Sequence, residues 1–274
     1  MRTVRTQYEA LRDDIGELQT RRPLPNQTLQ QIDPFLFLNH HGPQIYPPHN
    51  RGLPFGPHPH RGFETVTFII EGSLMHRDTA GHESIIRAGG VQWMTAGRGL
   101  EHAELSPPEF LRDGGPLEIL QLWINLPARL KMTEPRYIGL QRDEIPMRDG
   151  AGIIAGEWDG IEGPVASLTG VQMMTIELSA GRELQLSAPR ARNVFLYVVR
   201  GEVSIAGSPA RAFHLVDMND DGDAFPIRAA SSAIVLFGHA EPLREPVVSY
   251  GPFVMNTEEE IDAAIRDYQS GRFR

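Results

Sequence analysis

Four side chains able to bind a transition metal occur in two short repeats of the sequence, His58-x-His60 and His102-x-Glu104. In a β-strand, residues i and i+2 point to the same side, so each repeat can aim two ligands at one point. Two such strands facing each other inside a small barrel would gather three imidazoles and one carboxylate. This set suits Fe(II), Mn(II), Ni(II), Cu(II) or Zn(II), and it leaves one or two positions for water, substrate or O2.

The composition leaves few other kinds of metal site. Cysteine is absent, which excludes disulfides, cysteine-ligated zinc, iron–sulfur clusters and a cysteine nucleophile. Any metal must therefore be held by His, Asp or Glu. Three neutral imidazoles and one carboxylate carry one negative charge, so a bound divalent ion keeps a net positive charge. That charge favours an anionic, chelating oxygen ligand.

A second carboxylate, Glu64, follows His60 by four residues and would point the same way in an uninterrupted strand. It is either a direct ligand or, as we expect, a group behind the ligands that orients them or accepts a proton. Four large apolar residues could line an aromatic substrate pocket or could form plain core: Phe63, Phe68, Trp93 and Met94.

The remaining histidines are not predicted to bind a metal. Three of them belong to a proline-rich segment and are expected to be solvated, with gating of the site as the alternative: His40, His41 and His49. Four others have no partner at ligand spacing and are expected to be structural or at the surface: His76, His82, His214 and His239.

The elements that must position these side chains read as β-strands. The 274 residues include 27 glycines and 22 prolines without a period, which is typical of many short strands and turns. Apolar runs at 63–70, 91–94 and 117–124 are separated by glycines. Short helices are expected at residues 8–18 and after a capping box formed by Thr257 and Glu260.

The strand pattern occurs twice. Residues 195–203 resemble residues 66–74, because both contain an apolar strand, one charged residue, a glycine turn and a second strand. We therefore predict an all-β chain made of two copies of one barrel. The predicted boundaries are a metal-site barrel at 1–126, a linker at 127–150, and a second barrel with the terminal helix at 151–274.

Charge and hydropathy exclude several other classes of protein. The net charge is −9 and no long basic run is present, so direct nucleic-acid binding is not expected. No stretch approaches 18 uninterrupted apolar residues, and the first residues lack the apolar core of a signal peptide. We expect a cytoplasmic protein that does not bind membranes.

Several contiguous motifs resemble the pirin family. They are the segments 58–66 (HPHRGFETV), 92–99 (QWMTAGRG), 102–104 (HAE), 242–246 and 251–258. The resemblance spans about residues 30–270 and implies two stacked cupin barrels, also called double-stranded β-helices. It also implies one non-haem metal ion, usually Fe(II), in the N-terminal barrel. Matched residue by residue, the family's ligands fall on His58, His60, His102 and Glu104.

The same resemblance suggests an activity and an alternative to it. Some pirins are similar to quercetin 2,3-dioxygenases, which implies an oxidoreductase acting on a small aromatic substrate, a quercetin-like flavonol or related enol, with O2. Glu104, or Glu64 nearby, would then accept the hydroxyl proton. The alternative is a metal- or redox-sensing regulatory protein that binds a protein partner and has little turnover. No metal is expected in the second barrel, where Ser187 and Pro189 align with His58 and His60.

Overall fold

The computed structural model describes residues 1–273. They form two compact units, each assembled from separate stretches of sequence. The first barrel unit contains residues 12–21, 35–142 and the segment from 243 onward, whereas the second contains 1–11, 22–34 and 143–242. This division differs from the contiguous boundaries expected from the sequence, because both ends of the chain return to a unit distant in sequence.

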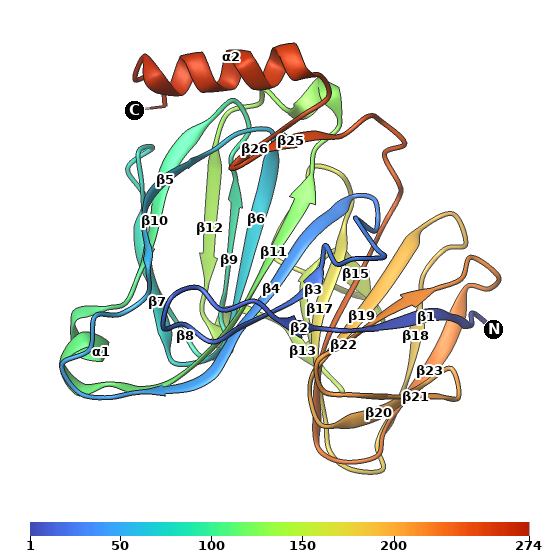
Figure 1. Cartoon of the computed structure of the whole chain (residues 1–274). Coiled ribbons are helices and arrows are strands. Elements are labelled where there is room, and N and C mark those ends of the chain that lie inside the picture. The colour runs from blue at the N-terminus through green and yellow to red at the C-terminus, as the bar shows by residue number, and fades with distance from the viewer. Residues whose placement is uncertain (274) are drawn as a thin grey trace. The chain divides into compact units, whose positions relative to one another are not determined.

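The first barrel unit is built from two sheets of antiparallel strands (Figure 1). Its strands are β2 (Leu11–Arg12), β3 (Thr20–Leu24), β4 (Phe35–Tyr46), β5 (Phe55–His60), β6 (Phe63–Glu71), β7 (Ser73–Asp78), β8 (Glu83–Arg87), β9 (Val91–Thr95), β10 (Leu100–Leu105), β11 (Gly115–Asn125), β12 (Arg136–Leu140), β25 (Val248–Tyr250) and β26 (Phe253–Met255). One sheet has the order β5-β10-β7-β8, and the other has the order β12-β9-β6-β11-β4-β3-β2. A separate hairpin pairs β25 with β26.

The helices of this unit are short. They are α1 (Pro108–Asp113) and α2 (Glu258–Gln269), with 3-10 turns at Ala128–Leu130 and Arg142–Glu144. The capping box at the start of α2 is confirmed, because the Thr257 side chain accepts from the Glu260 backbone and Glu260 reaches back to the cap. Ile261 and Ala264 bury one face of α2 against the β25–β26 hairpin, which lies beneath the helix in Figure 1. No helix within residues 1–273 combines the length and apolar character needed to cross a membrane.

The second barrel unit repeats the same plan. Its strands are β1 (Val4–Glu9), β13 (Met147–Arg148), β14 (Ala151–Ala155), β15 (Glu157–Trp158), β16 (Ile161–Glu162), β17 (Gln172–Leu178), β18 (Glu183–Ser187), β19 (Asn193–Arg200), β20 (Glu202–Ile205), β21 (Ser208–Arg211), β22 (His214–Met218), β23 (Ala224–Ala229) and β24 (Ala233–Ala240). The sheet β18-β23-β20-β21 corresponds to β5-β10-β7-β8, and β1-β22-β19-β24-β17-β14-β13 corresponds to the larger sheet. The predicted all-β duplication is therefore confirmed.

The same glycine turn occupies the same place in both copies. Gly72 joins β6 to β7 with φ +83°, and Gly201 joins β19 to β20 with φ +80°. Only glycine adopts this conformation without strain. A Cβ atom would also lie 2.6 Å from a backbone oxygen at Gly72 and 2.2 Å from one at Gly201. These contacts explain why the sequence repeat is centred on a glycine.

The expected helix at residues 8–18 is wrong. The chain there forms the end of β1 and the short strand β2. β1 pairs antiparallel with β22, so that Tyr8 lies opposite Leu215. Residues 8–10 pair with a chain segment about two hundred residues away, a partner that a local apolar pattern does not reveal. Ile15 and Leu18 bond to each other as a bridge and not as a helical turn.

Candidate metal centre

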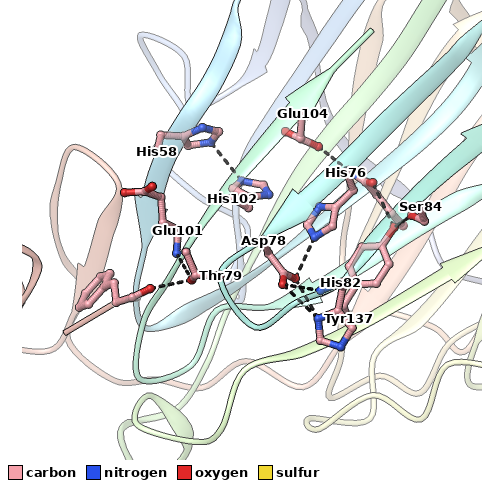
Figure 2. Close-up of polar contacts among 12 residues, drawn as sticks. His58, His76, Asp78, Thr79, His82, Ser84, Glu101, His102, Glu104 and Tyr137 are labelled. Atoms are coloured by element: carbon pink, nitrogen blue, oxygen red, sulfur yellow. Dashed lines mark hydrogen bonds and ion pairs between the residues drawn. The ribbon is translucent and has the colours of Figure 1, made fainter. Parts of the chain in front are cut away.

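Three histidines converge at one edge of the first barrel, between two adjacent strands. β5 carries His58 and His60, and β10 carries His102, which lies directly opposite His58 in the antiparallel register. One ring nitrogen from each residue lies within 4.8 Å of the other two. Figure 2 shows one pair of them, His58 and His102, whose Nε2 atoms are 3.0 Å apart. The predicted gathering of these three residues is thus what the structure has.

Each histidine has one ring nitrogen that faces away from the group, and the contact of that nitrogen determines which nitrogen keeps its lone pair. The Nδ1 atom of His58 lies 2.7 Å from the Gly56 carbonyl oxygen, and Nδ1 of His60 lies 3.4 Å from that of Pro252. A carbonyl oxygen only accepts hydrogen bonds, so these contacts place the proton on Nδ1 and leave the lone pair on Nε2. The Nε2 lone pairs then face the centre of the group.

Burial keeps two of the three rings, those of His60 and His102, neutral. The His60 pKa is lowered to about 3, first because burial disfavours the cation and second because His58 lies alongside. The same causes, burial and the neighbouring imidazoles, hold the pKa of His102 well below its usual value. Since a metal ligand must be an unprotonated imidazole, both rings are ready to bind an ion at neutral pH. His58 is only partly buried and provides access from solvent.

Glu104 lies two residues after His102 on β10 but does not belong to the group within 4.8 Å. Its carboxylate is held from the opposite sheet. Oε1 accepts from the Thr67 hydroxyl at 2.8 Å and from the Gln92 amide at 2.5 Å, and Oε2 accepts from Gln121. Three donors fix this buried carboxylate on the same barrel face as the histidines.

Glu64 lies on the face of β6 opposite to the one that carries Thr67. Both belong to β6, three positions apart, so their side chains lie on opposite faces of the sheet. The Thr67 side chain reaches Glu104, whereas Glu64 accepts from the Thr95 hydroxyl at 2.7 Å. Burial raises the pKa of Glu64. Glu64 was expected to point the same way as His60, which required one uninterrupted strand. β5 instead ends at His60, and Gly62, with φ +90°, breaks the alternation before β6 begins.

The four large apolar candidates for a substrate pocket also divide between the two faces of this sheet. Phe63 contacts the His60 ring at a centroid distance of 5.0 Å, and Met94 follows Gln92 by two residues on β9. Phe68 and Trp93 each adjoin a residue that reaches Glu104, so they lie on the opposite face as core. Sequence reasoning missed Trp123, whose ring lies 5.4 Å from His60 and 4.5 Å from Phe63.

The expectation that His40 and His41 are solvated is wrong, while His49 is exposed. Both buried residues belong to β4, which extends to Tyr46, further into the proline-rich segment than expected. His40 Nε2 lies 2.8 Å from the Glu118 carboxylate, and His41 Nδ1 lies 2.8 Å from the Thr20 hydroxyl. Pro43 lies inside β4 at a shift in register between His41 and Gln44, where a proline does not prevent the residues on either side from pairing.

The side chains present fit a divalent transition-metal ion. Two nitrogen ligands about 2.1 Å from one ion and about a right angle apart lie about 3 Å from each other. The two facing Nε2 atoms are 3.0 Å apart. Two lone pairs at that separation repel each other unless a proton or a cation lies between them. The donor set of neutral imidazoles is one that Fe, Ni, Cu and Zn accept.

Two models of known protein families match this chain. The model of the Pirin family matches residues 17–124, and the model of the Pirin C-terminal cupin domain matches residues 173–274. The chain belongs to the pirin family. Its two barrels are accordingly cupin domains, as the motifs around His58 and His102 led us to expect.

Individual relatives cover nearly the whole of this pirin-family chain. "Pirin-like protein 2" of Arabidopsis thaliana is 40% identical over 267 residues, which are 92% of this chain and 79% of that one. A crystal structure of quercetin 2,3-dioxygenase from Acinetobacter baumannii is 32% identical, with a TM-score of 0.92 over 100% of this chain and 98% of the other. A bacterial pirin from Escherichia coli, solved with nickel(II), shares the fold at 23% identity and a TM-score of 0.71 (86% of this chain, 99% of that one).

Proposed function

We propose that this chain is a metal-dependent cupin dioxygenase that cleaves a quercetin-like flavonol or related enol with O2. The observation that carries the proposal is the group of three histidines, with its two facing Nε2 atoms, on the same barrel face as the fixed carboxylate of Glu104. Support comes from the relative of known structure that is named quercetin 2,3-dioxygenase. The proposed setting is the cytoplasm.

In this proposal the ion is Fe(II), held by His58, His60 and His102 with Glu104 as the fourth ligand. When bound, such an ion supplies a Lewis acid that lowers the pKa of an enol hydroxyl and supports chemistry with O2. The three imidazoles contribute no charge, so the site stays cationic and attracts an enolate. Glu104, which Thr67, Gln92 and Gln121 hold in place, is also the proposed acceptor of the hydroxyl proton.

The aromatic rings next to the histidines suit a flat substrate. Phe63 and Trp123 pack against each other and against His60, and Phe37 stacks on Trp123 at 4.6 Å. His58, Phe37 and Trp123 are each only partly buried. We propose that the flavonol rings bind against this aromatic edge, because ring stacking adds affinity beyond the area that it buries.

The decisive experiment measures metal content and turnover on the same preparation. The wild type should contain about one iron per chain and should consume quercetin in air, seen as loss of its visible absorbance and release of CO. His102→Ala removes a ligand and should lose both metal and activity. The exposed residue His49 offers a matched control, since His49→Asn should change neither.

Two results would refute different parts of the proposal. Full metal content in His102→Ala would refute the site. A fully loaded wild type that leaves quercetin unchanged would refute this substrate while leaving the metal site standing.

A further inference from the structure

The outward nitrogen of His102 differs from those of His58 and His60. Metal-bound histidines almost always donate the second ring N–H to an acceptor, which fixes the tautomer and the orientation of the ring. His58 and His60 have backbone carbonyl oxygens in this role. The Nδ1 atom of His102 is fully buried and has no hydrogen-bond partner among the described residues. The third ligand therefore needs an acceptor of a different kind.

The neighbouring ring of His76 supplies a matching unpaired atom. β7 and β10 pair so that His76 lies opposite Glu104 and Asp78 lies opposite His102. The rings of His76 and His102 have centroids 5.4 Å apart. The His76 side chain is fully buried, and its Nδ1 atom also has no partner within residues 1–273. Two imidazoles with this centroid separation have ring nitrogens about 3 Å apart when those nitrogens face each other, which is hydrogen-bond distance.

Asp78 determines which His76 nitrogen carries the proton. Its Oδ2 atom lies 2.9 Å from His76 Nε2, and both side chains are nearly or fully buried. Despite burial, which acts in the opposite direction, contacts with His76 and His82 lower the pKa of Asp78, so it is an anion. A carboxylate anion only accepts, so the proton is on Nε2 of His76 and the lone pair is on Nδ1.

Tyr137 fixes the plane of the His76 ring from the other side. The two rings are stacked at a centroid distance of 4.1 Å and an interplanar angle of 15°. The Tyr137 hydroxyl is itself tied to Ser84 and, at 3.4 Å, to Gln92. Figure 2 shows the His76 ring between His102 and Tyr137, with Asp78 below it.

We propose that Asp78 and His76 form a positioning pair for His102, in which His76 Nδ1 accepts the Nδ1–H of His102. The pair sets the tautomer that leaves the His102 Nε2 lone pair facing His58. This inference rests on the proposed metal site and extends it by two residues that touch neither ion nor substrate. A sequence search for ligand spacing misses them, because the contact arises from the register of β7 against β10.

The test reverses one hydrogen bond while keeping the shape of the side chain. In Asp78→Asn, the amide can donate to His76 Nε2, which moves the His76 proton to Nδ1 and opposes the His102 N–H. Affinity for Co(II), measured on the full chain by competition with a chelator, should fall by about 10–100-fold. His82→Ala is the matched control: His82 contacts the same carboxylate from the exposed side, and its removal should change affinity less than about twofold.

A double-mutant cycle separates positioning from a general structural effect. In a His76→Phe background, which retains a ring against Tyr137, Asp78→Asn should have no further effect on Co(II) affinity. An equal loss in both backgrounds, or no loss in the wild-type background, would overturn the positioning pair. Failure of the proposed metal site has a separate signature, since Co(II) would then bind equally well to the wild type and to His102→Ala.

Discussion

Two buried carboxylates, Glu104 and Glu64, have opposite surroundings in the first barrel. Glu104 lies on the face shared with the histidines and accepts from three side-chain donors. Glu64 lies on the other face of β6, where burial raises its pKa. Their isosteric substitutions should therefore differ in kind.

Glu104→Gln should lower iron content sharply, by at least about tenfold in affinity, since it removes the carboxylate and sets an amide against two amide donors. Glu64→Gln should keep its iron within a few-fold. It should instead remove a pH dependence of the unfolding free energy. Because the Glu64 pKa is raised on folding, the wild-type protein loses stability as pH rises above about 4.5. Metal analysis and urea unfolding of the metal-free proteins at pH 5 and 7 report both effects. If Glu64→Gln lost the metal and Glu104→Gln kept it, the two roles would be exchanged.

Single residues show where sequence reasoning succeeds at this site and where it stops. Spacing identified His58, His60 and His102 because strand alternation is a local rule that holds within β5 and β10. The same rule misplaced Glu64, because Gly62 ends one strand before the next begins. A Cβ atom at Gly62 would lie 2.0 Å from the Val254 oxygen, a contact that depends on a segment far along the chain.

At the scale of elements, the strands with strong apolar runs were predicted well, and the elements that depend on distant partners were not. β6, β9 and β11 agree with their apolar runs, and α2 begins at its capping box. β12 falls inside the stretch expected to be a linker, yet it pairs with β9. Such a strand has no signal of its own, since its pairing supplies the hydrogen bonds that define it.

A buried lysine joins the turn that follows His60 to two other elements of the first barrel unit. Lys131, the single lysine of the chain, is 1% exposed, and burial lowers its pKa to about 8. Its Nζ atom donates to the Gly62 carbonyl, the Asn125 side chain and the Val254 carbonyl at 2.9, 2.6 and 3.0 Å. It thereby ties the turn after His60 to β11 and to the β25–β26 hairpin.

Lys131→Met preserves the length of the side chain but removes all three donors. Unfolding free energy should fall by at least about 2 kcal/mol, because buried acceptors are left without partners. Amide exchange should accelerate first in residues 248–255. Arg77→Met is the surface control: this exposed ion pair with Glu83 should contribute less than about 1 kcal/mol. Unchanged exchange in the hairpin would show that the lysine does not hold it.

At the scale of the whole molecule, the duplication could be predicted from the sequence, and the course of the chain between the units could not. The repeat around Gly72 and Gly201 reflects a turn that each barrel needs for itself. The composition of the units reflects long-range pairings, such as β1 with β22 and the bridge between Arg61 and Phe253. Those pairings join residues more than two hundred positions apart in one case, and no local pattern encodes them.

The two barrels share a topology but differ in what fills them. The first barrel directs histidines, Glu104 and amide side chains inward from β5, β10 and the facing sheet. In the second, the strands that take those places, β18 and β23, contribute buried apolar residues instead: Leu184, Leu186, Phe225 and Ile227. Apolar side chains offer no ligand atoms, and within residues 1–273 the metal-capable group is that of His58, His60 and His102.

We therefore expect one metal ion per chain, bound by the first barrel alone. Elemental analysis of the wild type after saturation with Co(II) and gel filtration should give about one ion per chain. The triple variant His58→Ala/His60→Ala/His102→Ala should give none, while its far-UV circular dichroism stays that of a β-protein, because apolar packing of the sheets is the main source of stability. Two ions per chain in the wild type, or one in the triple variant, would require a second site. Either result would contradict the claim that the first barrel alone binds metal.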